Sequence, residues 1–285
     1  MRKKAKNLKP ESWSLTIGWL YPELMSTYGD RGNIIVLTKR AEWRGIKVKV
    51  ERISIDSKAE SLKTCHMLFM GGAQDTQQEI VNQDLFSVKG KALREKIENG
   101  TPGLFICGAY QFLGRYYKTA DGKELPGLGI FPAYTENPGE KSPRLIGNII
   151  AEVNGKWLMV NGNSTINHKL STINQIVGFE NHGGRTYLED PSLAFAKVIK
   201  GYGNNGNQPR LDGGQAGDKT EGIIYRNSIG SYLHGPILPK NPELADWLIQ
   251  KALEKKYEEE VILEKLDDSL ETKAKNSVIK NILRN

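Results

Sequence analysis

Short apolar runs in the first half of the chain predict buried strands. Residues 14–20, 67–70 and 103–107 are mostly apolar, and the last two runs are followed directly by glycine. Such short, continuous runs are typical of parallel strands that are covered on both faces. Residues 47–55 instead alternate charged and apolar side chains, with a slip at Glu51–Arg52. This alternation predicts a strand near the edge of the sheet.

Amphipathic segments lie between these runs and predict helices. GDRGN at residues 29–33 indicates a turn and the start of a helix. Four apolar residues share one face of that helix: Ile34, Leu37, Ala41 and Trp43. Residues 75–98 predict one or two helices, with a break near Gly90. Because strands and helices alternate, the fold class is α/β, a doubly wound and mostly parallel sheet.

The second half of the chain has a different pattern. Three segments separated by polar loops predict further strands: residues 148–153, 194–201 and 221–235. Residues 201–222 are rich in glycine and predict a long hairpin loop. Residues 241–257 predict a helix, with Asn241 as its N-cap and Pro242 at its first position.

These elements predict a single domain with an extension at each end. We expect a basic tail over residues 1–12, a single domain over residues 13–257 and a charged extension over residues 258–285. The extension has sparse leucines among many charges, so a peripheral helix and a disordered tail are both compatible with it. The full length of 285 residues is enough for one large α/β domain.

Composition and charge exclude several classes of protein. The chain is 38% hydrophobic and 26% charged, and no apolar run is long enough for a transmembrane helix. The first nine residues are basic and lack the apolar core of a secretory signal, so we expect a protein of the cytoplasm or of the inner membrane face. Those residues carry five of the seven net positive charges, which leaves +2 for the rest. Nucleic acid is therefore not an expected partner.

Cys107 is the candidate nucleophile. Two cysteines are too few for a disulfide framework, and the four histidines are scattered, so no metal site is predicted. Cys107 stands where a buried strand meets a helix, a junction that exposes a side chain and favours a thiolate. Gly108 follows, as a tight nucleophile elbow requires, and its N–H can donate to an oxyanion. The alternative is a buried structural cysteine.

A cysteine nucleophile needs a base, and two histidines are candidates. His234 lies in SYLHGP at the end of a predicted strand, and His182 lies in GFENHGGRT. Spacing does not choose between them, because the partners meet in space. Gly71–Gly72 follows a strand and can bring backbone N–H groups close to a substrate. GYGNNG at residues 201–206 is rejected as a dinucleotide site, since no helix pattern follows it.

Taken together, these segments resemble class I glutamine amidotransferases of the cobyric-acid-synthase-like branch. Within that branch the chain is similar to the GatD family, the glutaminase subunits of lipid II isoglutaminyl synthases. Six segments carry the resemblance: residues 21–46, 70–78, 107–114, 178–186, 200–206 and 230–236. They span nearly all of the predicted domain and, taken jointly, are specific. The resemblance implies the flavodoxin-like fold of class I amidotransferases.

The resemblance also implies roles for individual residues. Cys107 matches the nucleophile and His234 the general base and acid. Gly72 matches the oxyanion position, with Gly108 as the second donor, and Gln111 matches a residue of the glutamine pocket.

Two further residues are assigned to glutamine binding. Arg144, in SPRLIGN, matches an arginine that contacts glutamine in the GatD family. His182 is expected in the glutamine-binding loop if it is not the base.

The chain departs from the wider superfamily at the third catalytic position. Most members carry His-x-Glu, and Pro236 stands at that place here. The GatD family shares this departure, so a Cys–His dyad is expected. The loop at residues 207–220 is longer than the resemblance predicts.

The implied activity is glutamine hydrolysis that supplies ammonia to a partner. By resemblance, that partner is a Mur-ligase-like, ATP-using MurT subunit, which forms a heterodimer with this chain and amidates the D-glutamate α-carboxyl of lipid II. No cofactor is expected in this chain. The alternatives are an amidotransferase for another acceptor, such as a cobyric acid precursor, and a catalytically silent scaffold subunit. A peptidase-like relative with an elbow cysteine is disfavoured by Gln111.

Overall fold

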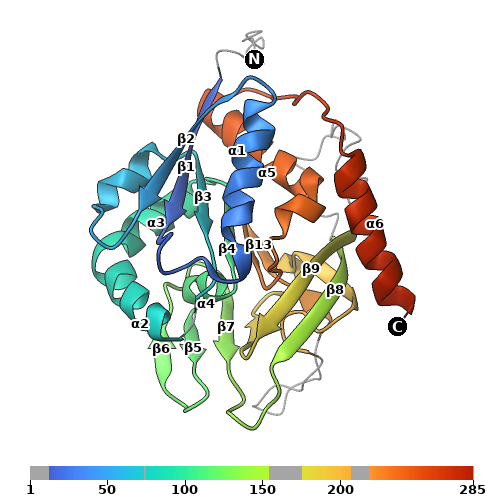
Figure 1. Cartoon of the computed structure of the whole chain (residues 1–285). Helices are drawn as coiled ribbons and strands as arrows, with labels where there is room; N and C mark the ends of the chain where they lie inside the picture. The colour runs from blue at the N-terminus through green and yellow to red at the C-terminus, as the bar shows by residue number, and fades with distance from the viewer. Residues whose placement is uncertain (1–12, 74, 154–174, 207–217, 285) are drawn as a thin grey trace.

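A six-stranded, mostly parallel sheet forms the centre of the molecule (Figure 1). The computed structural model describes residues 13–73, 75–153, 175–206 and 218–284. The strand order is β13-β14-β4-β3-β1-β2, and all neighbours run parallel except β13 and β14. The strands are β1 (Ser14–Leu20), β2 (Lys47–Ile53), β3 (Met67–Met70), β4 (Gly103–Ile106), β13 (Ile223–Tyr225) and β14 (Ser228–Ser231). The predicted α/β fold with a mostly parallel sheet is confirmed.

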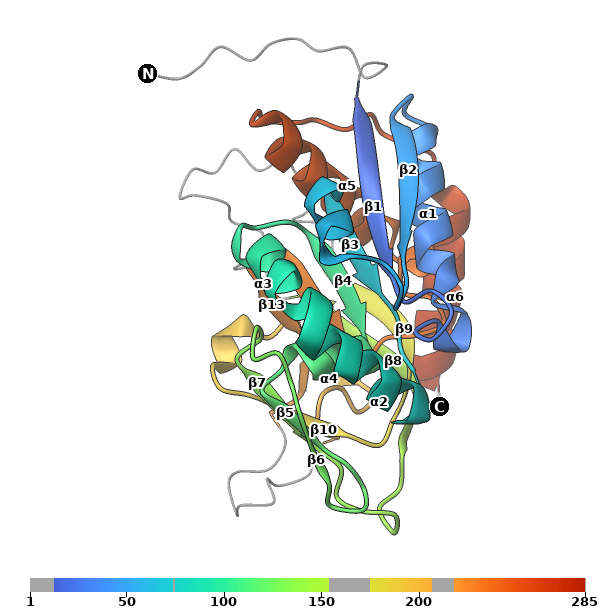
Figure 2. The same ribbon diagram turned by 90° about the vertical axis from the view of Figure 1, so that its left-hand side faces the viewer.

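Helices cover both faces of this sheet, as a doubly wound fold requires. Figure 2 shows α2 and α3 on one side of the strands and α1 on the other. Helix α5 packs beside α1 and contacts β1 and β3. The helices are α1 (Arg31–Glu42), α2 (Asp75–Asp84), α3 (Gly90–Glu98), α4 (Gly108–Leu113), α5 (Pro242–Tyr257) and α6 (Ser269–Arg284). Short 3-10 turns occur at Thr27–Gly29, Ala59–Thr64, Pro191–Leu193 and Leu238–Lys240.

Two smaller sheets lie below the central sheet in Figure 1 and supply one wall of the candidate site. The first has the order β10-β7-β5-β6 and the second β12-β11-β8-β9. Their strands are β5 (Tyr116–Lys118), β6 (Glu124–Pro126), β7 (Ala133–Glu136), β8 (Leu145–Val153), β9 (Gln175–His182), β10 (Arg185–Leu188), β11 (Ala196–Lys200) and β12 (Thr220–Glu221).

The segment after α5 packs against the domain and ends in α6. Ile282 of α6 packs on Ile150 and Val177, and so covers part of the outer face of β8 and β9. Before α6, Asp268 accepts a hydrogen bond of 2.6 Å from Arg40 of α1. Arg40 is almost fully buried and also pairs with Asp246 of α5 at 2.8 Å. Of the two expectations for the C-terminal extension, the structure therefore shows the peripheral helix.

Most predicted elements match, and the differences have local causes. Trp43 does not share the buried face of α1, since its side chain is 62% exposed. The break expected near Gly90 is instead a π-helical turn over Leu85–Lys89 that joins α2 to α3. Asn241 does precede α5, but its side chain bonds the backbone of Val177 and leaves the helix end uncapped.

The remaining predictions concern the second half of the chain, the basic N-terminal tail and membrane-spanning helices. The strand expected over residues 221–235 is a hairpin of β13 and β14. Residues 207–217 of the long loop and the whole basic tail lie outside the described residues. No helix in the described part of the chain is long and apolar enough to span a membrane.

Candidate active site

Cys107 stands at a strained elbow between β4 and α4. Its φ is +52° and its ψ −105°, a backbone conformation that residues other than glycine rarely adopt. The Cys107 N–H donates to the Ser231 carbonyl of β14 at 2.8 Å, and the Cys107 carbonyl accepts from the Gln111 N–H at 3.0 Å. These two bonds hold the strained turn. Strain that the surrounding structure maintains in this way is a mark of functional sites.

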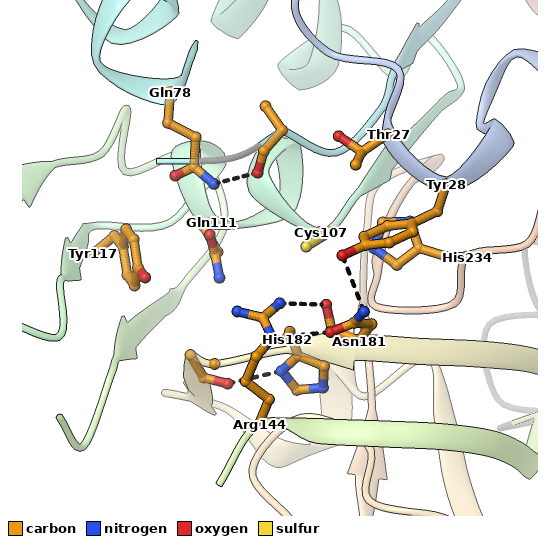
Figure 3. A pocket seen from close by; sticks show the side chains of 13 residues that line it. Thr27, Tyr28, Gln78, Cys107, Gln111, Tyr117, Arg144, Asn181, His182 and His234 are labelled. Atoms are coloured by element: carbon orange, nitrogen blue, oxygen red, sulfur yellow. Dashed lines mark hydrogen bonds between the residues drawn. The ribbon is translucent and has the colours of Figure 1, made fainter. Parts of the chain in front are cut away.

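His234 lies against this elbow and comes from the segment after β14. Its backbone is fixed by paired hydrogen bonds with Phe179 of β9, at 2.7 and 3.3 Å. A Cβ placed on Gly72 would lie 2.8 Å from Cε1 of His234 and 3.2 Å from Cβ of Cys107. Gly72 therefore has to be glycine for the histidine and the cysteine to meet. Figure 3 shows the Cys107 sulfur beside the His234 ring.

A buried carboxylate, Asp30, contacts the other side of the histidine. Asp30 Oδ1 lies 3.3 Å from His234 Nδ1, and both side chains are fully buried. Asp30 Oδ2 accepts a hydrogen bond of 2.7 Å from the Gly72 N–H. This contact corrects the expectation that the Gly72 N–H donates to an oxyanion, because in the structure it is directed at Asp30. The next residue, Ala73, lines the pocket instead.

The charges around His234 favour its protonated form. Burial by itself lowers the pKa of His234, but the charge of the Cys107 sulfur and the hydrogen bond and charge of Asp30 outweigh burial and raise it to about 10. Its Nε2 has no nitrogen or oxygen partner in the described part of the chain, and its contact with the Cys107 sulfur also raises this pKa. The imidazole is therefore protonated at neutral pH and can pair with the sulfur, which is the arrangement of an activated cysteine nucleophile.

His182 also lines the pocket, but its environment is different. Burial lowers the pKa of His182, and its ring stacks on Tyr232 with the ring centres 3.6 Å apart. Its Nδ1 lies 2.8 Å from the Gly184 carbonyl. Because the stacked ring stays neutral and is held by the β9–β10 turn, His182 is placed as part of the pocket wall. The neighbouring Glu180 is fully buried and accepts the backbone N–H groups of Tyr202 and Gly203, which ties GFENHGG to the KGYGNNG turn.

The elbow opens into a cavity of about 300 Å³, a size that suits a small metabolite. Its lining includes six of the residues considered above: Ala73, Cys107, Gln111, Arg144, His182 and His234. Gln111 is nearly buried, and its Nε2 donates to the Tyr232 hydroxyl at 3.1 Å. The structure thus brings the residues predicted for glutamine binding to the same cavity as the nucleophile.

Arg144 is held at the mouth of this cavity by Asn181. Arg144 Nε donates to Asn181 Oδ1 at 2.9 Å, and Nη2 donates to the Asn181 carbonyl at 3.0 Å. Asn181 Nδ2 in turn donates to the Tyr28 hydroxyl at 3.0 Å (Figure 3). The remaining nitrogen, Nη1, lies 3.5 Å from the position a Cβ would take on Gly183. That edge of the guanidinium is available to an anionic group in the cavity.

Three residues of this site were missed in the sequence. Asp30, Tyr28 and Asn181 each come from a segment whose function could not be assigned without the fold. Asp30 lies in a GDRG turn after the first strand, and an acid at that place is ordinarily taken for a helix cap. Tyr28 has a φ of +55° and meets the His234 ring edge-on at 5.0 Å. Among the described residues, no group of three His, Cys, Asp or Glu side chains is placed to hold a metal ion.

An elbow cysteine that faces a histidine at the end of a parallel sheet defines a cysteine-dependent hydrolase or transferase of the α/β class. The chain belongs to the CobB/CobQ-like glutamine amidotransferase family, which matches residues 16–242. The resemblance noted in the sequence is therefore confirmed.

The chain is similar to two GatD subunits of lipid II isoglutaminyl synthase (glutamine-hydrolysing). It is 44% identical to that of Staphylococcus aureus over 242 residues, which cover 85% of this chain and 86% of the relative. It is 36% identical to that of Streptococcus pneumoniae over 258 residues, which cover 90% and 88% of the two chains. The probable cobyric acid synthase of Methanopyrus kandleri is 33% identical, but the match covers only 53% of this chain and 28% of that protein.

Solved structures share the fold at low sequence identity. The glutaminase domain of Trypanosoma brucei CTPS with bound acivicin has a TM-score of 0.54 and 10% identity, and the match covers 88% of this chain and 96% of that domain. A glutamine amidotransferase has a TM-score of 0.50 and 15% identity, and the match covers 83% and 98%. These two likenesses support the class I amidotransferase fold.

Proposed function

We propose that this protein hydrolyses glutamine at the Cys107–His234 pair and passes the ammonia to a MurT-type, Mur-ligase-like subunit. That partner would use ATP to amidate the D-glutamate α-carboxyl of lipid II. The observation that carries the proposal is the elbow cysteine beside His234 inside a pocket, in a chain similar to GatD subunits over 85% of its length. No cofactor is proposed for this chain.

The reaction we propose uses one covalent intermediate. The Cys107 sulfur attacks the side-chain amide carbon of glutamine, and His234 gives its Nε2 proton to the departing nitrogen, which leaves as ammonia. A γ-glutamyl thioester remains on Cys107. His234, now neutral, takes a proton from water, and the resulting attack releases glutamate and regenerates the sulfur and the imidazolium.

The oxyanion of the tetrahedral intermediates needs two donors near Cys107. We propose the N–H groups of Gly108 and Ala73 for this role. Gly108 follows the nucleophile, and a Cβ placed on it would lie 3.4 Å from the Ala73 nitrogen, so the two backbone segments adjoin. The Gly72 N–H is not assigned to this role, since Asp30 accepts it.

Arg144 gives the first prediction. Its guanidinium can hold the α-carboxylate of glutamine through two parallel hydrogen bonds, which a lysine cannot copy. Arg144→Ala should raise the KM for glutamine on the order of 10- to 100-fold, the usual effect of losing hydrogen bonds to a charged group. Arg144→Lys should also raise it, and kcat should change little in either variant. Steady-state kinetics of glutamate release would measure both effects. An unchanged KM in both variants would show that Arg144 is a surface residue that does not bind glutamine.

Reconstitution with the partner gives the second prediction and tests the proposed function. The purified chain and its MurT-type partner should form a stable heterodimer in size-exclusion chromatography. With ATP, glutamine and a lipid II acceptor, the pair should yield amidated stem peptide, detected by mass spectrometry. Glutamine hydrolysis should be faster inside the complex than with the chain alone, because free hydrolysis would waste glutamine. The Cys107→Ser variant of the same complex is the matched control.

Two other outcomes of this assay would separate the alternatives. Glutaminase activity with no heterodimer and no amidated lipid II would exclude the proposed acceptor. Corrinoid precursors would then be the next acceptors to test, since cobyric acid synthases are among the relatives. Complex formation without hydrolysis in any mixture would favour the scaffold alternative, against which the assembled Cys107–His234 pair argues.

A further inference from the structure

Asp30 is a buried carboxylate that does not cap helix α1, although it stands directly before that helix. It precedes the first residue of α1, where an aspartate ordinarily accepts an N–H of the first helical turn. Its own backbone is helical, with φ −54° and ψ −24°, and its side chain makes no capping bond. It is fully buried all the same. A buried charge costs free energy unless it is paired, so its actual partners define what it does.

Each oxygen of Asp30 has a different partner in the active site. Oδ1 lies 3.3 Å from Nδ1 of His234, and Oδ2 accepts the Gly72 N–H at 2.7 Å. The packing around this carboxylate is close. A Cβ placed on Gly71 would lie 2.9 Å from Asp30 Oδ2, so a larger residue there would displace the carboxylate. Thr27, on the same turn, donates its hydroxyl to the Gly72 carbonyl at 2.7 Å. The turn before α1 therefore holds both sides of Gly72 as well as the histidine.

Position 236, two residues after His234, offers no carboxylate to the histidine, because a proline stands there. Pro236 packs onto α1, and a Cβ placed on Gly32 would lie 2.4 Å from its Cγ. The charged and titratable groups that face His234 are the Cys107 sulfur, the Asp30 carboxylate and, at the ring edge, Tyr28. Asp30 is thus the carboxylate in position to bond Nδ1 while Nε2 faces the sulfur.

We infer that Asp30 is a positioning residue for glutamine hydrolysis and completes a Cys107–His234–Asp30 triad from a part of the chain far from both. Its Oδ1 holds the proton on Nδ1 of His234, which points Nε2 at Cys107, and its Oδ2 fixes the glycine turn beside the nucleophile. Asp30 neither gains nor loses a proton during turnover. The inference rests on the proposed function for its substrate, whereas the geometry it concerns does not depend on glutamine.

Asp30→Asn tests this inference, because asparagine keeps the shape and can still accept the Gly72 N–H. We expect kcat for glutamine hydrolysis to fall on the order of 10²- to 10⁴-fold, with KM changed less than about threefold, since Asp30 does not line the cavity. The pKa of His234 should fall, because a negative charge beside the imidazolium is removed. ¹⁵N-imidazole NMR of the labelled protein measures that pKa directly.

Asp246→Asn is the matched control. Asp246 also pairs with a buried cation, Arg40, but lies on α5 away from the cavity. It should lower the melting temperature without changing the kcat for glutamine or the pKa of His234. If Asp30→Asn changes only the melting temperature, as this control does, Asp30 is a structural residue and the inference is wrong.

Two measurements keep the test independent of folding and of the proposed substrate. In the unmodified protein, NMR should show a proton on Nδ1 of His234 across neutral pH, and a ring protonated only on Nε2 would overturn the inference. Alkylation of Cys107 by iodoacetamide needs no glutamine, and it should slow in Asp30→Asn but not in Asp246→Asn. If neither chain nor complex hydrolysed glutamine while these two results held, the proposed function would fail and the triad would stand.

Discussion

Replacing Cys107 by serine should abolish glutamine hydrolysis and leave the fold intact. Serine has the shape of cysteine with a smaller side-chain atom, and the two hydrogen bonds of the elbow are made by the backbone, so they should persist. The hydroxyl is a far weaker nucleophile than a cysteine paired with an imidazolium, and loss of a nucleophile that acts with its base costs at least about 10⁴-fold in rate. Glutamate release, measured by a coupled assay, should fall to background. Partner binding should be unchanged.

Cys65 provides the internal control for this experiment. It is the other cysteine of the chain, is buried before β3 and does not line the cavity. Burial raises the pKa of the Cys65 thiol to about 11, so it is unreactive at neutral pH. Cys65→Ser should hydrolyse glutamine normally, and diazo-oxo-norleucine should label Cys107 alone. Labelling at Cys65, or full activity in Cys107→Ser, would overturn the assignment of the nucleophile.

His234→Ala should have the second largest effect, a loss on the order of 10²–10⁴ in kcat. The variant removes both the proton donor for the leaving ammonia and the positive charge that pairs with the Cys107 sulfur. His182→Ala should cost less and act mainly through KM, because burial keeps this ring neutral and it forms part of the cavity wall. Steady-state kinetics of the two variants side by side would measure the difference.

The reverse ranking of the two histidines would mean that the base is His182. The environments favour His234 on physical grounds: its pKa is raised by two negative neighbours, and that of His182 is lowered by burial. The rate of Cys107 alkylation at neutral pH adds a second readout. The rate should fall in His234→Ala, since the sulfur loses the imidazolium that pairs with it, and it should stay unchanged in His182→Ala.

Much of the fold was predictable from local pattern alone. Buried strands such as Met67–Met70 and Gly103–Ile106 are short apolar runs, and helix Pro242–Tyr257 begins at an Asn-Pro pair. These signals depend on neighbouring residues, so the chain itself contains them. Trp43 was placed on the wrong side because helical spacing gives a face but not its edges. The π-helical turn at Leu85–Lys89 adds one residue to a helical turn, and no local sequence pattern predicts this insertion.

The residues of the candidate site also fall into those that local pattern predicts and those that it does not. Cys107, Gly108 and Gln111 lie within five consecutive residues, and an elbow that is built by adjacent residues can be recognised in sequence. Arg144 was placed only through resemblance and His182 was first a competing candidate for the base, and the structure brings both to the cavity. Their roles in glutamine binding remain predictions.

By itself, the sequence determined the class of fold, the elbow cysteine and the family, because each depends on short-range pattern or on several motifs taken together. Only the tertiary structure decided what surrounds the histidine. Asp30 is 204 residues from His234, and the Gly72 N–H turns to Asp30 and not to the cavity. Such contacts arise where the ends of β1, β3 and β14 converge in the folded sheet. Their distances depend on packing across the whole domain, and sequence spacing does not contain that information.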